Sequence, residues 1–258
     1  FAGRNWPVWL AGTLQADGHY ASASAGAVEA QAMAIAALRA AYQPVPAGAA
    51  AWLKSAAQPD GGWGATPSGP SDAYHTGLAL WALGLAGEPD TAAVVQNGVA
   101  YLAGQQLADG GFPRAGGAGS DPRATGAAVL GLLAAGENLL DAAWLADGWS
   151  VFDALLSMQS SAGAFILPGA GEPDVEATLW GVMGLLGRTA PLRQRHLAAE
   201  RAVEWLHTQQ CLNDATCDPT LTGPGSFGPA STTSDAILAI AAVGQDPDSE
   251  EWTLGGQS

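Results

Sequence analysis

Basic residues are scarce in this sequence. Its 258 residues include nine lysines and arginines against 24 aspartates and glutamates, which makes the net charge -15. Lys54 is the only lysine. A surface this acidic repels the phosphates of nucleic acids and of anionic lipid headgroups. The composition therefore argues against nucleic acid and against an anionic membrane surface as partners.

Long hydrophobic runs and cysteines are also few. No stretch reaches the roughly 18 consecutive apolar residues of a membrane-spanning helix, so we expect no membrane span. The two cysteines, Cys211 and Cys217, lie close together in a turn-rich segment. We interpret them as a disulfide, which is typical of exported proteins and predicts an extracellular or cell-surface location. The alternative is a metal site that adds His207 and Asp218, but these residues lack a compact chelating spacing, so we expect no metal and no cofactor.

An internal repeat runs along the whole chain. A Trp or Tyr is followed by Leu, and an Asp-Gly-Gly-aromatic turn begins eight residues after the first aromatic. The clearest copies are Trp52-Leu53 with Asp60-Gly61-Gly62-Trp63, and Tyr101-Leu102 with Asp109-Gly110-Gly111-Phe112. Less regular copies begin at Trp9, Ala154 and Trp205. A period of about 50 residues predicts an architecture built from repeated supersecondary units.

Each repeat is predicted to form two helices joined by a Gly-rich loop. The first helix carries the aromatic-Leu pair, as in the segment from Thr91 to Gln106, and the turn glycines end it. The second helix is apolar on all sides and rich in Ala and Gly, which indicates that protein surrounds it. No segment alternates with a period of two, so the prediction is an all-α fold. We expect one domain over residues 1–258, with five helix-pair repeats at about 1–43, 47–87, 90–136, 141–187 and 192–244 and the start of a sixth.

The phrase Gln-x-Asp-Gly-Gly-Trp from Gln58 to Trp63, followed by a Thr-x-x-Ala/Leu-rich helix, resembles the prenyltransferase and squalene-cyclase repeat superfamily. The resemblance implies an α/α toroid, in which an inner ring of helices encloses a central cavity and an outer ring surrounds it. It extends to class II terpene cyclases, protein prenyltransferase β subunits, complement-type thioester domains and cobalamin carriers. These groups share an architecture and differ in chemistry, so the function must come from the site.

The diagnostic motifs of the catalytic branches are absent. Terpene cyclases of this class carry Asp-x-Asp-Asp, and the nearest string here is Asp246-Pro247-Asp248-Ser249 in a connector. The Asp, Cys and His of a prenyltransferase zinc site are not gathered on second helices, and the thioester stretch Gly-Cys-Gly-Glu-Gln does not occur. We therefore expect an exported, non-catalytic toroid that binds a small apolar or corrinoid-like ligand, or a protein or glycan partner, at its cavity mouth. The alternatives are an isoprenoid-processing enzyme without the usual acid motif, and a structural module of a larger surface protein.

Functional residues are expected where the second helices begin, because these starts would converge on one cavity mouth. The candidate ligand-binding residues are Glu29, Asp72, Tyr74, His75, Thr76, Arg123, Thr125, Asp174, Glu176, Trp180, Thr233 and Asp235. The aspartates at helix starts also fit a capping role. Glu29 and Glu176 have apolar neighbours, and an unpaired buried carboxylate is costly, so we expect them to face water or a ligand. An acid/base pair of these two is possible in principle, although three repeats separate them.

The aromatic residues give a further criterion. A cavity lined by Trp63, Trp81, Phe112 and Trp180 would favour a ligand-binding protein or isoprenoid chemistry. A cavity filled by side chains would favour a structural module.

Overall fold

The computed structural model describes residues 10, 12–20, 27–187, 193–210, 227, 230–247, 249 and 252. Within these residues the chain forms helices and isolated antiparallel bridges, and no β-strand. The inner helices are α2 (Ala27–Ala40), α4 (Ala73–Leu85), α6 (Pro122–Ala134), α8 (Val175–Leu185) and α10 (Ala230–Ala242). The outer helices are α3 (Ala47–Ser55), α5 (Ala93–Gln105), α7 (Val151–Ser157) and α9 (Arg193–Gln209), with the short 3₁₀ helix η1 (Ala142–Trp144) before α7.

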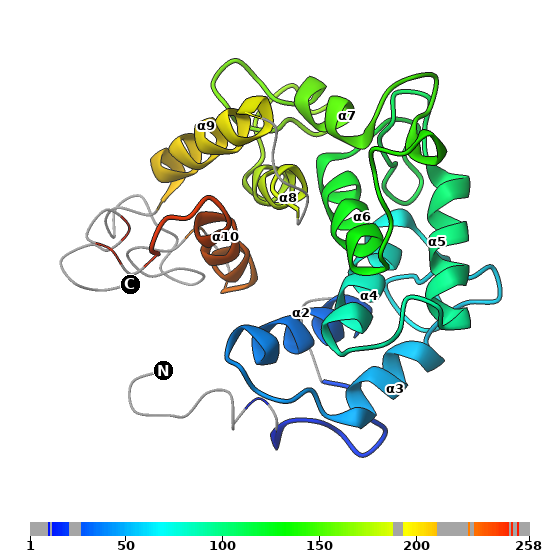
Figure 1. Cartoon of the computed structure of the whole chain (residues 1–258). Helices are drawn as coiled ribbons and strands as arrows, with labels where there is room; N and C mark the ends of the chain where they lie inside the picture. The colour runs from blue at the N-terminus through cyan, green and yellow to red at the C-terminus, as the bar shows by residue number, and fades with distance from the viewer. Residues whose placement is uncertain are drawn as a thin grey trace.

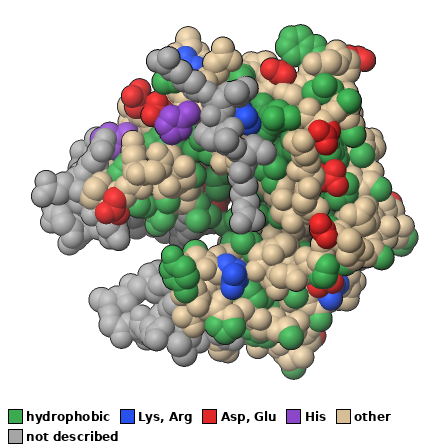
Figure 2. Space-filling model, viewed as in Figure 1, with side chains coloured by type: hydrophobic (Ala, Val, Ile, Leu, Met, Phe, Trp, Pro, Cys, Tyr) green, Lys and Arg blue, Asp and Glu red, His purple; other side chains and the backbone are tan. Residues whose placement is uncertain are grey.

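The helices are arranged as two concentric rings. Each inner helix packs against the next one in order, from α2 through α4, α6 and α8 to α10, and the outer helices pack against this row from outside (Figure 1). In Figure 1 the row curves round until α10 faces α2 across the open side. On the face seen in Figure 2, acidic side chains are scattered and basic ones are few. This arrangement confirms the predicted all-α toroid.

Small residues set the spacing of the inner ring. A Cβ atom on Gly126 of α6 would lie 2.1 Å from the carbonyl oxygen of Trp180 on α8. A Cβ atom on Gly77 of α4 would lie 2.4 Å from the backbone of Ala127 on α6. Both glycines therefore allow neighbouring backbones to approach more closely than any side chain would permit, as the Ala and Gly content of these helices indicates.

The Asp-Gly-Gly-aromatic turn follows the outer helix of one repeat and contacts the outer helix of the next. Gly61 has a φ angle of +89°, which an L side chain rarely adopts, and a Cβ atom there would lie 2.7 Å from the carbonyl oxygen of Asn97 on α5. Oδ1 of Asp60 accepts hydrogen bonds from the Gly62 N–H at 3.1 Å and from Oγ of Ser71 at 2.8 Å. Hydrogen bonds to Asp60 therefore stabilise the turn, and its backbone packs against the outer helix of the following repeat.

A second repeated contact joins the turn to its inner helix. The N–H of each turn aromatic donates to a threonine hydroxyl on the helix that follows: Trp63 to Thr76 at 2.9 Å, Phe112 to Thr125 at 3.0 Å, Phe165 to Thr178 at 2.9 Å, and Phe227 to Thr233 at 3.1 Å. These bonds identify the structurally equivalent positions of four repeats. The threonine of the fourth repeat is Thr178, two residues after Glu176.

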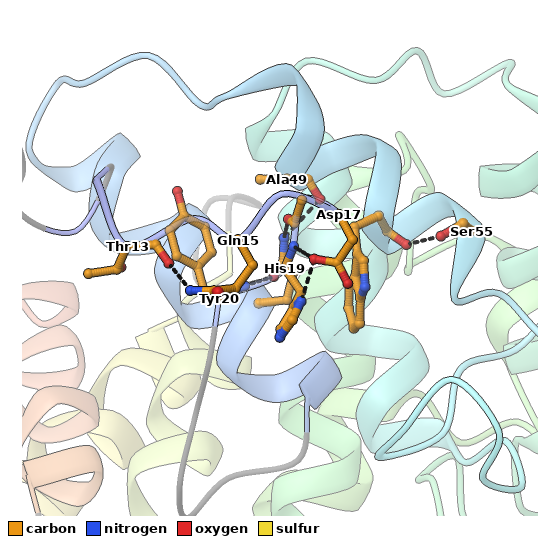
Figure 3. Close-up of polar contacts among 10 residues, drawn as sticks. Thr13, Gln15, Asp17, His19, Tyr20, Ala49 and Ser55 are labelled. Carbon is orange, nitrogen blue, oxygen red and sulfur yellow. Dashed lines mark hydrogen bonds and ion pairs between the residues drawn. The ribbon is translucent and has the colours of Figure 1, made fainter.

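In the first repeat a glutamine replaces the threonine and bonds to Tyr20 and Ala49, both of which are labelled in Figure 3. Oε1 of Gln31 accepts from the Tyr20 N–H at 2.8 Å, and its Nε2 donates to the carbonyl oxygens of Gly18 at 3.0 Å and Ala49 at 2.9 Å. The longer amide therefore joins the turn, its own helix and the outer helix α3. Gln31, rather than Glu29, occupies the position that the turn-binding threonine has in the other repeats.

Candidate active site at the starts of the inner helices

The aspartates at the starts of the inner helices act as caps. Oδ1 of Asp72 accepts from the His75 N–H at 2.9 Å, and Oδ1 of Asp174 accepts from the Ala177 N–H at 2.7 Å. The Nδ1 atom of His75 lies 2.7 Å from the second carboxylate oxygen of Asp72. The capping interpretation of Asp72 and Asp174 accounts for these contacts, and His75 is held by the cap of its own helix.

Several predicted mouth residues belong to the scaffold. Thr76, Thr125 and Trp180 are fully buried, and both threonine hydroxyls are occupied by the turns described above. Thr233 is half-buried and makes the same bond to Phe227. Among the aromatics named as a cavity lining, Trp63, Phe112 and Trp180 are fully buried, and only Trp81 is half-buried. Trp63 and Phe112 therefore fill the space between the inner and outer helices. Among these four aromatic residues only Trp81 has a partly exposed side chain.

Tyr74 lies at the centre of the remaining polar side chains. Its hydroxyl donates to Oε1 of Glu29 at 3.3 Å, which joins the first turns of α4 and α2. Its ring meets Trp180 edge-on, with centroids 5.5 Å apart, and His75 in the same way at 5.1 Å. The guanidinium group of Arg114 lies 5.6 Å from the ring centroid. This tyrosine therefore connects residues from four repeats.

The second glutamate is bound by an arginine. Nη1 of Arg123 donates to Oε2 of Glu176 at 3.0 Å, and Nη2 of Arg123 lies 3.6 Å from Asp121. Glu176 was expected to be a lone carboxylate, and the structure corrects this by pairing it across α6 and α8.

Asp235 on α10 has a different environment. Burial, together with the nearby charges of Glu176 and Glu29, raises the pKa of Asp235 from 3.8 to about 8. Its exposed fraction is 7%, and no described residue forms a hydrogen bond or ion pair with its carboxyl group. At neutral pH this carboxyl group therefore carries its proton.

Glu29, Glu176 and Asp235 form a group that we call the acid cluster. Burial raises the pKa of Glu29, an effect that His75 partly offsets and the charge of Glu176 increases. Burial also raises the pKa of Tyr74, and all three acids raise it further. Such mutual influence requires that α2, α8 and α10 bring these side chains near one another. The first and the last described helices of the inner ring thus place acids within electrostatic range of one another.

The chemistry that this cluster can perform is proton transfer. It combines a neutral carboxylic acid with a carboxylate fixed by an arginine, next to a buried aromatic ring. A carboxyl group whose pKa lies near neutral pH is suited to act as a general acid. In the described part of the chain, no three His, Cys, Asp or Glu side chains lie close enough together to hold one metal ion.

Two features of this site were not among the predicted mouth residues. One is Arg114, which lies in a Gly-rich loop and faces Tyr74. The other is the string Asp174-Val175-Glu176-Ala177, which keeps acids at the first and third positions of Asp-x-Asp-Asp and has Ala in the last. Its place at the start of a second helix was the signal that could have identified it.

Two other expectations concern the remainder of the chain. Cys211 and Cys217 lie outside the described residues, so their disulfide stays a prediction. Among the described helices, none combines the length and the apolar character needed to cross a membrane.

The sequence matches a known family model. Residues 46–103 and 94–222 match the model described as the prenyltransferase alpha-alpha toroid domain. No curated protein matches the chain.

Solved structures share the fold at low sequence identity. A protein from Actinoplanes is 17% identical, with a TM-score of 0.66, over 96% of this chain and 80% of its own. The type II terpene cyclase MstE from Scytonema is also 17% identical, with a TM-score of 0.66, over 95% and 73% of the two chains. The ent-copalyl diphosphate synthase from Streptomyces platensis is 18% identical, with a TM-score of 0.63, over 88% and 41%. A variant of MstE has been solved with geranylgeranyl dihydroxybenzoate as its substrate.

Proposed function

The chain belongs to the prenyltransferase alpha-alpha toroid family, and we propose that its inner ring binds an isoprenoid and that Asp235 protonates one of the double bonds of this ligand. The observation that carries the proposal is the burial of the Asp235 carboxyl group near Glu29 and Glu176 inside the inner ring, which raises its pKa to about 8. The isoprenoid substrate of a structural neighbour with the same fold supports the ligand class.

The proposed reaction begins with an electron pair of the ligand. The π electrons of a double bond take the proton of Asp235, which forms a C–H bond and leaves a carboxylate and a carbocation. A second double bond attacks this cation and forms a C–C bond, which moves the positive charge along the ligand. Loss of a proton from the final cation to water restores a double bond, and the carboxylate of Asp235 regains a proton from solvent. No oxidant or reductant is needed.

The surroundings of Asp235 suit the charge that this reaction creates. The carboxylate of Glu176 is fixed by Arg123 before any ligand enters, so it needs no reorganisation when positive charge develops. The ring of Tyr74 offers a π face of the kind that attracts cations. Asp235 itself is 7% exposed, which limits the access of water to its carboxyl group.

The test is the uptake of deuterium. Geranylgeraniol incubated with the protein in heavy water should give a cyclised product that carries one deuterium atom at the protonated carbon. Asp235→Asn keeps the shape and removes the acidic proton, so turnover should fall by about 10² to 10⁴. Asp147→Asn is the control, because Asp147 is exposed in a turn of the outer layer.

Two outcomes would contradict the proposal. Unchanged turnover in Asp235→Asn would show that another group supplies the proton. Binding of isoprenoids by the wild-type protein without any product or deuterium uptake would favour the alternative of a non-catalytic carrier, in which the neutral Asp235 only lowers the polarity of the site.

Location is a separate proposal. A disulfide between Cys211 and Cys217 and the export that it indicates rest on the sequence pattern. Comparing the mass of the alkylated protein with and without prior reduction tests the disulfide, since free thiols would be alkylated in both samples.

A further inference from the structure

Exposed apolar side chains are concentrated in the connection between α6 and α7. Six large apolar side chains are exposed among the described residues, and three of them are Leu140, Leu145 and Trp149, with exposed fractions of 55%, 41% and 56%. All three lie in the segment that contains η1 and joins the inner ring to the outer ring (Figure 1). Single exposed apolar residues are normal, whereas several in one short segment indicate a contact surface.

Backbone hydrogen bonds fix the position of Trp149. Its N–H donates to the carbonyl oxygen of Ala146 at 2.8 Å, and the N–H of Ala146 donates to the carbonyl oxygen of Trp149 at 3.0 Å. The two residues between them, Asp147 and Gly148, have φ angles of +48° and +87°. Two successive positive φ angles, with the sequence Asp-Gly, are typical of a type I′ turn. A tight turn of defined geometry therefore carries the exposed tryptophan.

The connection is also anchored to the third repeat. Nε1 of the buried Trp144 donates to Oε2 of Glu137 at 2.9 Å, and the carbonyl oxygen of Trp144 accepts from Nε2 of Gln106 at 3.1 Å. A Cβ atom on Gly110 would lie 2.8 Å from the carbonyl oxygen of Trp149, so the two turns pack backbone to backbone. Because the backbone is held in this way before a partner binds, binding has little chain to order.

The charges in this part of the chain have one sign. Residues 89–113 and 124–187 contain no lysine or arginine, although both ranges contain aspartates or glutamates. Asp141 is exposed next to Leu140, and Nδ2 of Asn138 donates to its Oδ1 at 2.7 Å. Four side chains of the connection therefore combine apolar area with an acidic group, and we call them the Trp149 surface: Leu140, Asp141, Leu145 and Trp149.

We propose that the Trp149 surface docks a segment of a partner protein that carries both apolar residues and arginine or lysine. The apolar residues would cover Leu140 and Leu145, and the cation would lie against the indole face of Trp149, near Asp141. Tryptophan is among the residues that contribute most to the affinity of protein interfaces. The net charge of -15 disfavours a second copy of this chain and anionic lipid as occupants, because like charges repel. Docking here requires no reaction at the acid cluster.

The experiment measures the affinity of the full chain for three synthetic peptides of equal length. The first peptide alternates pairs of leucines with pairs of arginines, the second has glutamates in place of the arginines, and the third has serines in place of the leucines. The wild-type protein should bind the first peptide at least about tenfold more tightly than either of the others, because only this peptide offers both the apolar and the cationic contact.

Two variants test the surface itself. Trp149→Ala should weaken the binding of the first peptide about tenfold, because it removes the aromatic face and its apolar area. Leu145→Ser should also weaken this binding, and it leaves the residues of the turn unchanged, so it stays informative if Trp149→Ala unfolds. The melting temperature of each variant checks its fold.

Tyr42→Ala is the matched control. Tyr42 precedes α3, lies outside the Trp149 surface and has an exposed fraction of 94%, so it is a second exposed aromatic residue on the same chain. Its loss should leave the affinity for the first peptide unchanged.

Several outcomes would overturn this docking surface. Equal wild-type affinity for the first peptide and either of the others would show that one kind of contact suffices. An unchanged affinity in both folded surface variants would place the contact elsewhere, and a wild-type protein that binds none of the peptides has no such surface. Sedimentation equilibrium and neutral phosphatidylcholine vesicles test the other occupants: self-association or adsorption to vesicles that Trp149→Ala abolishes would assign the surface to a second copy or to lipid instead.

Discussion

Nη1 of Arg123 on α6 donates a hydrogen bond to Oε2 of Glu176 on α8 at 3.0 Å, although 53 positions separate the two residues in the chain. The pair holds one carboxyl group of the acid cluster beside a guanidinium group. Glu176 has a cation as its neighbour, and Asp235 has the charges of two other acids. Two carboxyl groups of one site therefore differ in their electrostatic surroundings.

The first prediction concerns the charge of Glu176. Glu176→Gln removes a negative charge that raises the pKa of Asp235, so that pKa should fall below its wild-type value of about 8. NMR titration of ¹³C-labelled carboxyl groups measures it. Glu204→Gln on the outer helix α9 is the control and should leave it unchanged, and an unaltered or higher pKa in Glu176→Gln would contradict the coupling.

The second prediction concerns stability and pH. The Asp235 carboxyl group has a pKa near 3.8 in the unfolded chain and about 8 in the folded protein. Between these values the folded protein holds more protons, so this group lowers the free energy of unfolding as pH rises, by about 1.4 kcal/mol per unit. Above the pKa of the folded protein this decrease in the free energy of unfolding is complete. Below the pKa of the unfolded chain there is no decrease.

Urea denaturation at about pH 5 and about pH 7 measures this effect. Asp235→Asn should lose less stability than the wild-type protein between the two values, because its amide does not titrate. Glu29 still contributes in both proteins with the same sign, since burial raises its pKa as well. Equal pH dependence of the two proteins would contradict the raised pKa of Asp235.

The third prediction concerns the bond between turn and helix. Thr125→Val keeps the shape of a fully buried side chain and leaves the Phe112 N–H without its acceptor at 3.0 Å. The free energy of unfolding should fall by about 1–3 kcal/mol. Thr66→Val is the control, because Thr66 is exposed in a loop, and its stability should change little. An unchanged free energy of unfolding in Thr125→Val would mean that the hydrogen bond from Phe112 does not stabilise the turn.

The fourth prediction concerns the spacing of the inner ring. Gly126→Ala forces α6 away from the backbone of α8, where the new Cβ would lie 2.1 Å from a carbonyl oxygen, and should cost about 3 kcal/mol or more. Gly104→Ala on the outer helix α5 meets nothing within 4 Å and should gain up to about 1 kcal/mol from helix propensity. Thermal unfolding compares the two, and a tolerated Gly126→Ala would argue against the close approach.

The fold was largely predictable because it depends on local patterns. The glycine of each turn, the preceding aromatic-Leu pair and the apolar second helix lie within one repeat, so the chain shows them without tertiary information. Predicted boundaries were close, as with the segment from Thr91 to Gln106, which contains α5 from Ala93 to Gln105.

The residues that accept a hydrogen bond from the turn of each repeat were harder to predict. Glu29 and Glu176 drew attention because a charge in an apolar helix is unusual, while the neighbouring Gln31 and Thr178 looked ordinary. Those two satisfy the backbone N–H groups of Tyr20 and Phe165. Phe165 and Thr178 are 13 positions apart, as are Trp63 and Thr76, but Tyr20 and Gln31 are 11 apart. The sequence alone does not show that a side chain at this shorter distance meets the same donor.

The sequence by itself determined an all-α toroid of helix pairs, and it placed the starts of the inner helices at one mouth. Only the tertiary structure decided which charges meet there. Arg123 reaches Glu176, Tyr74 reaches Glu29, and Asp235 is left without a partner among the described residues. The physical reason is that a repeat specifies its own turn and helices locally, whereas a pKa depends on burial and on charges that other repeats bring across the ring.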